Sequence, residues 1–300
     1  MQSIKYIDRI TGNIELEKVY GSKILKFFYG NSKIGNFLCV FFAKNPFFSR
    51  LYGWLMKRSF SRSRIIPFIK AYQIDTSEFR ETPSSFKNFN DFFIRHLKKE
   101  CRPIHANKAI IPADGRYFFY QNIETVSEFI VKGQKFCLEK LIADKNLSDK
   151  YKGGSMVIAR LCPVDYHRYH FPIDCTPSTT KQINGYLYSV NPIAIKQNIN
   201  IFSENKRMLT KLKSKEFGNI LFIEIGAMNV GSIIQTSTPE EEYNKGDEKG
   251  YFSFGGSALI LLFEKNRIQF DEDLIGNELE IRCLMGQSMG SIVKIQNPGQ

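Results

Sequence analysis

The chain has 300 residues, which is enough for one large domain or two modest ones with a sizeable buried core. Hydrophobic residues make up 43% of the chain and charged residues 24%, and these proportions exclude a largely disordered protein. The net charge of +12 is concentrated near the N-terminus, where eleven cations and no carboxylate lie between Lys18 and Lys70, a pattern suited to an anionic membrane or to nucleic acid.

The first residues and the cysteines indicate the cellular compartment of the protein. Residues 1–10 have no basic head followed by an apolar stretch, so we expect no signal peptide. The six cysteines include no Cys-x-x-Cys pair, which favours reduced thiols in a cytosolic compartment. We therefore expect the protein on the cytoplasmic side of any membrane that it binds.

The most hydrophobic stretch of the chain covers residues 34–56. Lys44, Pro46 and Arg50 interrupt it, whereas a helix that spans a bilayer needs about 20 apolar residues in succession. We expect two helices that lie in the membrane interface, with aromatic side chains in the lipid and flanking cations at the headgroups. The alternative is a basic helical region that packs these aromatics onto the protein core. Residues 1–85 are therefore expected to form a helical, membrane-associating region.

Residues 86–300 are expected to form a β-rich catalytic domain. It begins with a helix between Phe86 and Pro103, for which Asn90 is the expected N-cap. After this helix, short β-rich runs alternate with Gly, Pro and Asn turns. The predicted fold class is α+β, with a mainly antiparallel β domain preceded by the basic, aromatic-rich helical region. The expected strands are 109–112, 117–120, 156–161, 185–189, 220–225, 232–236, 258–263 and 279–283.

Near the C-terminus, Ser257 directly follows Gly255 and Gly256. Two glycines let the backbone adopt conformations closed to other residues, so the Gly256 carbonyl can be presented under strain to the Ser257 hydroxyl. Once a base removes its proton, that hydroxyl can attack the carbonyl and cut the chain. Gly-Gly-Ser is also typical of an ordinary turn between two strands, and on its own it favours the turn.

Three other side chains could serve such a serine. Asp114 precedes Gly115 at the tip of a predicted turn, which is also where an ordinary turn aspartate is found. His167 and His170 stand three residues apart among aromatic residues, and they could instead be core histidines or half of a zinc site. No Cys or Glu shows the pairing of a zinc site, so no metal is expected. Asp114, His170 and Ser257 together suggest a triad.

Together these segments resemble the phosphatidylserine decarboxylase proenzyme family, and the resemblance extends over nearly the whole chain. Two places depart from the family pattern: Ala258 stands where Ser or Thr is more frequent, and residues 284–288 follow the family only loosely. The segments that carry the resemblance are Tyr6-Ile-Asp-Arg-Ile-Thr-Gly12, Phe89-Asn-Asp-Phe-Phe-Ile-Arg95, Arg102-Pro-Ile104, Pro112-Ala-Asp-Gly115, Asp165-Tyr-His-Arg-Tyr-His-Phe-Pro172, Tyr188-Ser-Val-Asn-Pro192, Gly226-Ala-Met-Asn-Val-Gly231, Lys245-Gly-Asp-Glu-Lys-Gly250 and Phe254-Gly-Gly-Ser257.

The resemblance implies a zymogen that activates itself. Ser257 would attack the Gly256 carbonyl, and the proenzyme would divide into a 1–256 chain and a 257–300 chain. The serine would become a pyruvoyl group, which is the covalent cofactor of the family. This group would act as an electron sink. Phosphatidylserine would form a Schiff base with it, lose carbon dioxide and leave as phosphatidylethanolamine, a reaction of phospholipid biosynthesis.

The resemblance also implies roles for the polar residues. By position in the family motifs, His170 would be the general base and Asp114 would orient it, since a buried carboxylate fixes an imidazole tautomer and stabilises the imidazolium. His167 would donate a proton or contact the substrate carboxylate.

The partners follow from the same resemblance. The two cleaved chains would form a heterodimer, and a further homo-oligomer stays open. Because the substrate is an anionic lipid, the cationic N-terminal region would bind the cytoplasmic face of the cell membrane as a peripheral protein. No nucleic-acid-binding module is recognisable, so no nucleic-acid partner is expected.

Two other classes of function stay open on the sequence. One is an uncleaved Ser-His-Asp lipid hydrolase, although the Gly-x-Ser-x-Gly elbow of such enzymes is absent. The other is a membrane-binding protein without catalysis, in which Gly-Gly-Ser is only a turn. Both predict an intact chain, whereas the decarboxylase predicts two.

Overall fold

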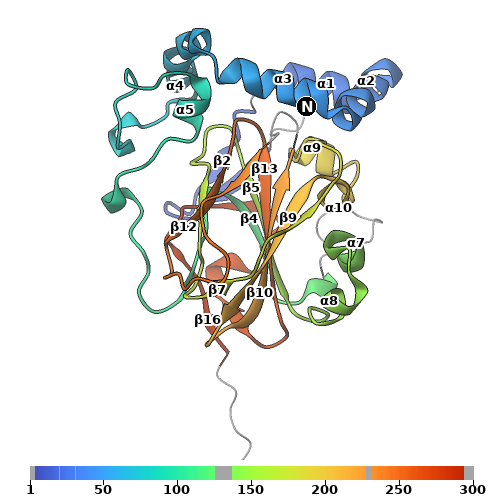
Figure 1. Ribbon diagram of the computed structural model, residues 1–300, viewed down its shortest axis with the longest axis vertical. Helices are drawn as coiled ribbons and strands as arrows, with labels where there is room; N and C mark the ends of the chain where they lie inside the picture. Colours follow the sequence, from blue (N-terminus) through green and yellow to red (C-terminus); the bar gives the residue numbers. More distant parts are fainter. Residues whose placement is uncertain (1–3, 20, 31, 126–136, 228–231, 294–300) are drawn as a thin grey trace, which may run out of the picture.

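A large, mostly antiparallel β-sheet forms the centre of the molecule (Figure 1). The computed structural model describes residues 4–19, 21–30, 32–125, 137–227 and 232–293. In the described part of the chain this sheet has ten strands, in the order β2-β1-β15-β4-β5-β13-β10-β9-β7, with β8 also paired to β9. Only β1 and β15 run parallel to each other among the paired strands described. The strands are β1 Lys5–Asp8, β2 Ile14–Leu16, β4 Gly115–Tyr120, β5 Ser155–Leu161, β7 Thr176–Pro177, β8 Lys181–Ile183, β9 Arg207–Ser214, β10 Gly218–Gly226, β13 Ser257–Phe263 and β15 Glu280–Cys283.

Two small sheets pack against one face of the large sheet. One contains β11 (Ile233–Gln235), β12 (Glu248–Phe252) and β6 (Arg168–His170), and the other contains β14 (Ile268–Phe270), β16 (Ser288–Ile292) and β3 (Ala109–Ile110). The opposite face is covered by short helices, namely α7 (Leu138–Ile142), α8 (Lys145–Asp149), α9 (Pro192–Ile195) and α10 (Ile201–Glu204).

Strand β13 lies between β5 and β10 and is buried on both faces. Leu259 and Leu261 pack toward the small sheets, whereas Ile260 and Leu262 pack toward the helices. A strand covered on both sides needs apolar residues at every position, which explains the unbroken run Ala258-Leu-Ile-Leu-Leu-Phe263. The residue at the head of this strand is therefore held by hydrogen bonds from two neighbours.

The helical layer lies across one end of the molecule (Figure 1). It contains α1 (Ser22–Tyr29), α2 (Lys33–Lys44), α3 (Pro46–Met56), the 3₁₀ helix Ser59–Arg64 and α4 (Ile65–Tyr72), with α5 (Phe89–Phe93) beside it. The expected pair of helices over 34–56 is confirmed. They break at Asn45, whose side chain caps α3 directly before a proline. Within the described residues, no helix combines the length and apolar character needed to cross a bilayer.

The N-terminus differs from the expected helical region. Residues of β1 pair with β15 and β2, so the first part of region 1–85 belongs to the large sheet. Tyr6 and Asp8 are buried and alternate with more exposed neighbours, which is the period of a strand. The expected division at residue 85 stays a prediction, since one aromatic cluster joins α4, Phe86 and α5.

Three further expectations were wrong in detail. Segment 185–189 is not a strand: Leu187 N donates to the Ala43 carbonyl at 3.1 Å and Ser189 N donates to Tyr29 Oη at 2.9 Å, so these donors serve the helical layer. Asn88, not Asn90, caps α5 by accepting from Asp91 N. The long helix expected after Phe86 is a single short one.

Candidate active site

Ser257 is the first residue of β13, and its side chain is completely buried. It pairs with Leu161 of β5 on one side and Gly226 of β10 on the other. Gly255 has a φ of 139°, a conformation that residues with a Cβ rarely adopt. The glycine-dependent turn expected before Ser257 is therefore present, and the Gly256–Ser257 peptide lies at the N-terminal end of the central strand β13.

His167 is the histidine that faces this serine. Its Nδ1 lies 3.5 Å from Ser257 Oγ, and its Nε2 lies 2.9 Å from the Cys162 carbonyl oxygen. A carbonyl oxygen only accepts hydrogen bonds, so Nε2 carries the proton and Nδ1 presents a lone pair to Ser257. The ring is thus held in the tautomer that can take a proton from the serine hydroxyl.

The surroundings of His167 keep its ring neutral. The imidazole is fully buried and stacks on Phe93 with ring centroids 3.9 Å apart. Burial lowers the pKa of His167 to about 3, and the charge of Arg95 acts in the same direction, while Asp165 opposes both. At neutral pH the Nδ1 lone pair is therefore free of a proton.

A buried ion pair shapes the turn that carries the Cys162 carbonyl. Arg116 Nη1 donates to both carboxylate oxygens of Asp165, at 2.6 and 2.5 Å. Asp165 in turn accepts from Cys162 N at 2.7 Å. Burial would raise the pKa of Asp165, but the charge and hydrogen bonds of Arg116 hold that pKa below its usual range. The chain of contacts from Arg116 to Cys162 therefore positions the acceptor that orients His167.

His170 occupies a different place from the one expected for a base. Its Nδ1 donates to the Gly246 carbonyl at 2.9 Å, and Tyr166 Oη donates to its Nε2 at 3.2 Å. Both ring nitrogens are thus engaged away from Ser257. Burial lowers the pKa of His170, so this ring also stays neutral. It joins β6 to the turn before β12.

Asp114 likewise has partners other than a histidine. Its carboxylate accepts from Arg102, with Arg102 Nη2 at 2.6 Å, and from Met285 N at 2.9 Å. Arg102 also binds Glu78 through two hydrogen bonds of 3.0 Å. The expected triad of Asp114, His170 and Ser257 is thus not joined by direct hydrogen bonds among the described residues. Asp114 instead ties the segment before β3 to the turn before β16.

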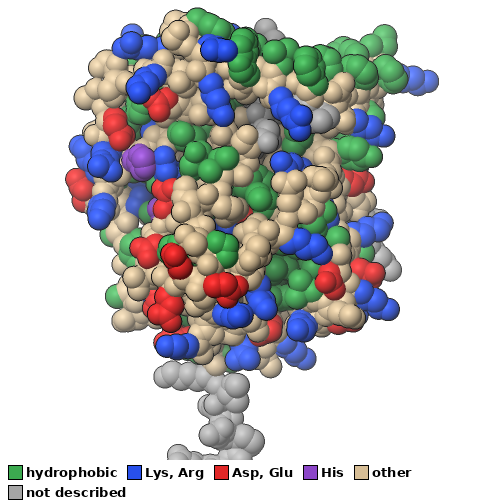
Figure 2. Space-filling view, in the orientation of Figure 1, with side chains coloured by type: hydrophobic (Ala, Val, Ile, Leu, Met, Phe, Trp, Pro, Cys, Tyr) green, Lys and Arg blue, Asp and Glu red, His purple; other side chains and the backbone are tan. Residues whose placement is uncertain are grey.

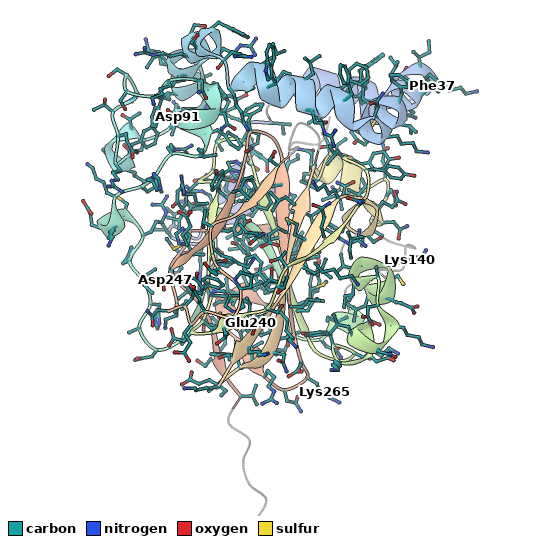
Figure 3. The ribbon with its side chains drawn as sticks, viewed as in Figure 1. Phe37, Asp91, Lys140, Glu240, Asp247 and Lys265 are labelled. Atoms are coloured by element: carbon teal, nitrogen blue, oxygen red, sulfur yellow. The ribbon has the colours of Figure 1, made fainter. Side chains whose placement is uncertain are left out.

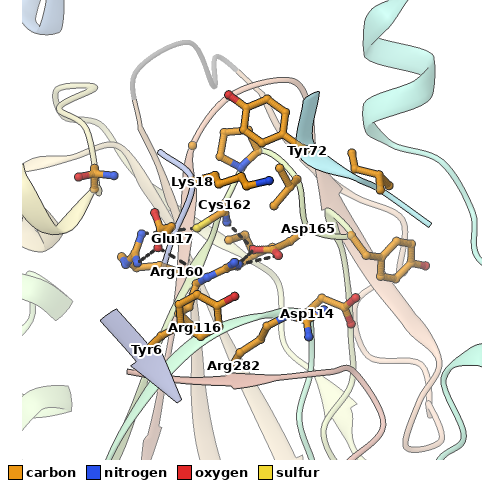
Figure 4. A pocket seen from close by; sticks show the side chains of 18 of the residues that line it. Tyr6, Glu17, Lys18, Tyr72, Asp114, Arg116, Arg160, Cys162, Asp165 and Arg282 are labelled. Carbon is orange, nitrogen blue, oxygen red and sulfur yellow. Dashed lines mark hydrogen bonds and ion pairs between the residues drawn. The ribbon is translucent and has the colours of Figure 1, made fainter. Parts of the chain in front are cut away.

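A pocket of about 560 Å³ adjoins the cleavage segment (Figure 4). Its lining combines Gly255 and Gly256 with Glu17 after β2, Leu25 of α1 and Tyr72 at the end of α4. The wall below contains the arginine and carboxylate side chains labelled in Figure 4. The pocket therefore connects the helical layer to the peptide bond that precedes Ser257.

Sequence reasoning missed several residues that build this site. Asn90 accepts from Phe254 N at 3.0 Å and so fixes the turn before Ser257. Phe93 and Asp165 lie inside segments that the motif comparison had already marked, so their position was a usable signal. Nothing local in the sequence indicates the contacts of Glu17 or the Cys162 carbonyl. Residues 228–231 of the Gly226–Gly231 motif lie outside the described part of the chain.

The described residues contain no group of three or more His, Cys, Asp or Glu side chains that could hold a metal ion. The polar atoms at Ser257 suit acid–base chemistry on the chain itself, because a neutral imidazole and a hydroxyl meet beside the Gly256–Ser257 peptide.

Comparisons with known proteins agree with this chemistry. The family model described as phosphatidylserine decarboxylase matches residues 89–291. The chain is 50% identical over 295 residues to the phosphatidylserine decarboxylase proenzyme of Chlamydia pneumoniae, with 97% of this chain and 98% of that protein covered. The proenzyme of the same name from Chlamydia trachomatis serovar D is 44% identical over 290 residues, with 95% and 96% covered. The resemblance seen in the motifs is confirmed, and the chain belongs to the phosphatidylserine decarboxylase proenzyme family.

Proposed function

We propose that this phosphatidylserine decarboxylase proenzyme activates itself by cleaving its chain between Gly256 and Ser257, with His167 as the base that serves the serine. The observation that carries the proposal is the approach of His167 Nδ1 to within 3.5 Å of Ser257 Oγ, with the tautomer set by the Cys162 carbonyl. This separation is long for a hydrogen bond, as catalytic contacts often are before the reacting geometry forms.

The first step uses only the chain's own groups. His167 takes the hydroxyl proton, and Ser257 Oγ bonds to the Gly256 carbonyl carbon. The carbon–nitrogen bond then breaks, and the proton passes to the departing amine of residue 257. An ester joins the two parts of the chain.

The second step divides the chain. Removal of the Cα proton of residue 257 expels the Gly256 carboxylate from Cβ and leaves dehydroalanine at the head of the smaller chain. Tautomerisation and hydrolysis by one water then release ammonia and leave a keto group. The residues around position 257 fit a pyruvoyl group, since this position is buried, adjoins the pocket and faces a neutral imidazole.

A pyruvoyl group at position 257 supplies the electron sink for loss of carbon dioxide from phosphatidylserine. In this reaction the residues of the protein have two roles: they exclude water, and they move one proton. His167 Nδ1, which carries no proton at rest, takes one from the substrate ammonium group as the amine is engaged, and it is placed to return that proton to the substrate carbon that has lost its carboxylate. Phe93, stacked on the ring, keeps this position dry.

The family motifs assign the base to His170 and its orientation to Asp114, and that assignment stays a prediction. The contacts of the described residues support a different division. His170 is hydrogen-bonded to Tyr166 and Gly246, and Asp114 is hydrogen-bonded to Arg102 and Met285. Both are therefore positioning residues in our proposal.

The test is the intact mass of the purified protein under denaturing conditions. Two chains that meet at Gly256/Ser257, with the smaller chain one ammonia lighter than a serine-headed peptide, are expected. Ser257→Ala and His167→Gln are expected to stay whole, while His170→Gln is expected to be cut slowly. A single uncut chain in an active preparation would refute self-cleavage and favour the hydrolase alternative. If the His167→Gln protein were cleaved rapidly and the His170→Gln protein were not cleaved, the base would be His170 and not His167.

We further propose that the helical layer rests on an anionic bilayer. Large apolar side chains remain exposed along it, and Figure 2 shows them gathered over this end of the molecule with basic side chains nearby. Such an arrangement is typical of interfacial helices. The most exposed are Phe27, Ile34, Phe37, Val40, Phe41, Phe47, Leu51, Trp54, Phe60 and Ile66. Leu25 and Tyr72 line the pocket from this layer, so a lipid headgroup could enter without leaving the membrane.

A further inference from the structure

Glu17 is a buried carboxylate at the end of an exposed hairpin. It directly follows β2, where Leu16 is 59% exposed, yet its own side chain is only 5% exposed. Figure 4 shows it directed into the pocket, next to Arg160. Arg160 Nη2 donates to Glu17 Oε2 at 2.8 Å, and Arg116 Nε lies 3.6 Å from the same oxygen.

The two arginines do not need Glu17 for charge balance. Arg116 is paired with Asp165, and Arg160 makes two hydrogen bonds of 2.6 Å to Glu280. These two pairs are already neutral, so Glu17 adds a third carboxylate to two cations. An additional anion in a buried site is costly unless the site is built to hold one.

One donor in this cluster is incompletely used. Among the described residues, the buried Arg116 Nε has no hydrogen-bond partner, since its 3.6 Å distance to Glu17 is too long for one. Arg116 is 5% exposed and lines the pocket. An anion with more oxygens than a carboxylate could engage this donor together with Arg160, and arginine binds phosphate oxygens through several N–H groups at once.

The cluster lies beside the cleavage segment. Arg160 pairs across the sheet with Ala258, the residue after Ser257, and the same pocket is lined by Gly255 and Gly256. The side chains of Arg160 and Ala258 point to the face of the sheet opposite that of Ser257, so an anion held here would share a cavity with the Gly255–Gly256 segment that precedes the serine.

The chemistry selects the phosphodiester of the headgroup over its carboxylate. The carboxylate departs as carbon dioxide, so an ion pair to it would be stronger in the ground state than in the transition state and would slow the reaction. The phosphodiester keeps its charge throughout, and binding it holds the lipid in place at no such cost.

We propose that Arg116 and Arg160 form a subsite for the phosphodiester of the substrate, and that Glu17 occupies this subsite until the lipid displaces it. One monoanion replaces another, so the charge of the cluster does not change on exchange. The hairpin that carries Glu17 is then a specificity element: a headgroup without a phosphate cannot release it. This inference rests on the proposed function.

The test measures binding in the full-length Ser257→Ala protein, which isolates binding from cleavage. Calorimetric titration uses glycerophospho-L-serine as the probe. Glu17→Gln keeps the shape and the hydrogen bond to Arg160 but removes the competing charge, so binding is expected to tighten about fivefold or more. Glu139→Gln on α7 removes an exposed carboxylate that does not line the pocket, and it is expected to bind as the parent does.

Further arms separate the alternatives. Glycerophosphoethanolamine, which has the phosphate without the carboxylate, is expected to show the same gain in Glu17→Gln, and free serine none. A gain with serine alone would assign the subsite to the carboxylate and overturn the proposal. Glu17→Asp keeps the charge and is expected to bind as the parent does. Equal tightening in Glu17→Asp would mean that a loosened hairpin, not a removed charge, opens the pocket.

Unchanged or weaker binding by a folded Glu17→Gln protein would also overturn the inference and leave Glu17 as a structural anchor. Its failure is distinguishable from failure of the proposed function. An uncut wild-type chain refutes self-cleavage whatever the titrations show, whereas a cut chain with no gain in Glu17→Gln refutes only the subsite.

Discussion

His167 and His170 stand three residues apart on nearly extended backbone, where residues at odd separation point to opposite faces. Only one of them can face Ser257, and the structure has His167 there. The motif comparison named both histidines and the serine as site residues and assigned the base to His170, and that assignment stays a prediction. The choice depends on how the residues directly before β6 pack against the head of β13, and these segments lie about 90 residues apart in the chain.

The two glycines before Ser257 have different roles, and substitution separates them. Gly255 has a φ of 139°, so Gly255→Ala is expected to cost about 1–3 kcal/mol of unfolding free energy and to slow cleavage. A Cβ on Gly256 would meet Ala227 and Val190 at ordinary contact distances of 3.8 and 3.9 Å, so Gly256→Ala is expected to fold normally. Denaturant titration of both variants in the Ser257→Ala background checks this. Equal losses would mean that the turn does not depend on the Gly255 conformation.

Burial of His167 predicts a loss of stability in acid. In the unfolded chain its pKa is near 6.5, and in the folded protein it is about 3, so below pH 6.5 only the unfolded state takes up the proton. This ring is therefore expected to remove about 1.4 kcal/mol of unfolding free energy for each pH unit between 6 and 4. His170 shifts in the same direction. In the Ser257→Ala background, His167→Gln should flatten the slope measured by denaturant titration. Parallel slopes would contradict a buried neutral ring.

At the scale of elements, the cleavage point that we propose lies at the head of a central strand. β13 begins at Ser257 and stays hydrogen-bonded to β5 and β10 along its length, while β15 and β16 of the smaller chain pair with β4 and β3. Strands from residues 1–256 therefore lie on both sides of β13 and also pair with β15 and β16.

We accordingly expect residues 1–256 and 257–300 to remain together after cleavage. Native mass spectrometry should show one complex with the summed mass of both chains, and only denaturant should separate them. Asp114 adds a further tie through Met285, so Asp114→Asn is the informative variant and should lower the denaturant concentration at which the chains part. Spontaneous separation in dilute native buffer would contradict the role of β13.

The elements also show what local patterns reveal. Strands with a continuous apolar run, such as β10 and β13, were predicted almost to the residue because both faces are buried. The N-terminal hairpin was missed, since β1 and β2 are short and β1 pairs with β15 from the other end of the chain. Segment 185–189 was assigned as a strand because its residues suit one, yet its donors are satisfied by the helical layer.

At the scale of the whole molecule, the exposed aromatic face and the opposite end have different roles. Figure 3 shows Phe37 on the helical layer and Lys265 at the far end. Phe37 and Phe47 are 71% and 62% exposed. Phe37→Ser combined with Phe47→Ser is expected to weaken binding to vesicles of phosphatidylserine and phosphatidylcholine by about tenfold or more, because each ring buried in lipid contributes about 1.5–3 kcal/mol.

Sedimentation with vesicles measures this binding. Ile292→Ser on β16 is the control, since it removes an exposed apolar side chain from the other end of the molecule and should change nothing. Binding should also weaken in high salt and with vesicles of phosphatidylcholine alone, because the cations of the layer are screened or lose their partners. If the control and the double variant lost vesicle binding equally, the helical layer would not be the surface that binds the membrane.

The sequence by itself determined the chemistry of this protein. The glycines and serine at 255–257 and the histidine pair indicate this chemistry only together with the other family motifs, whereas the break at Asn45 can be predicted from neighbouring residues alone. The tertiary structure decided which histidine faces Ser257, where Asp114 finds its partners and how Glu17 reaches Arg160. These contacts join segments far apart in the chain, and no local preference encodes them, since they form only when sheet register and packing bring the side chains together.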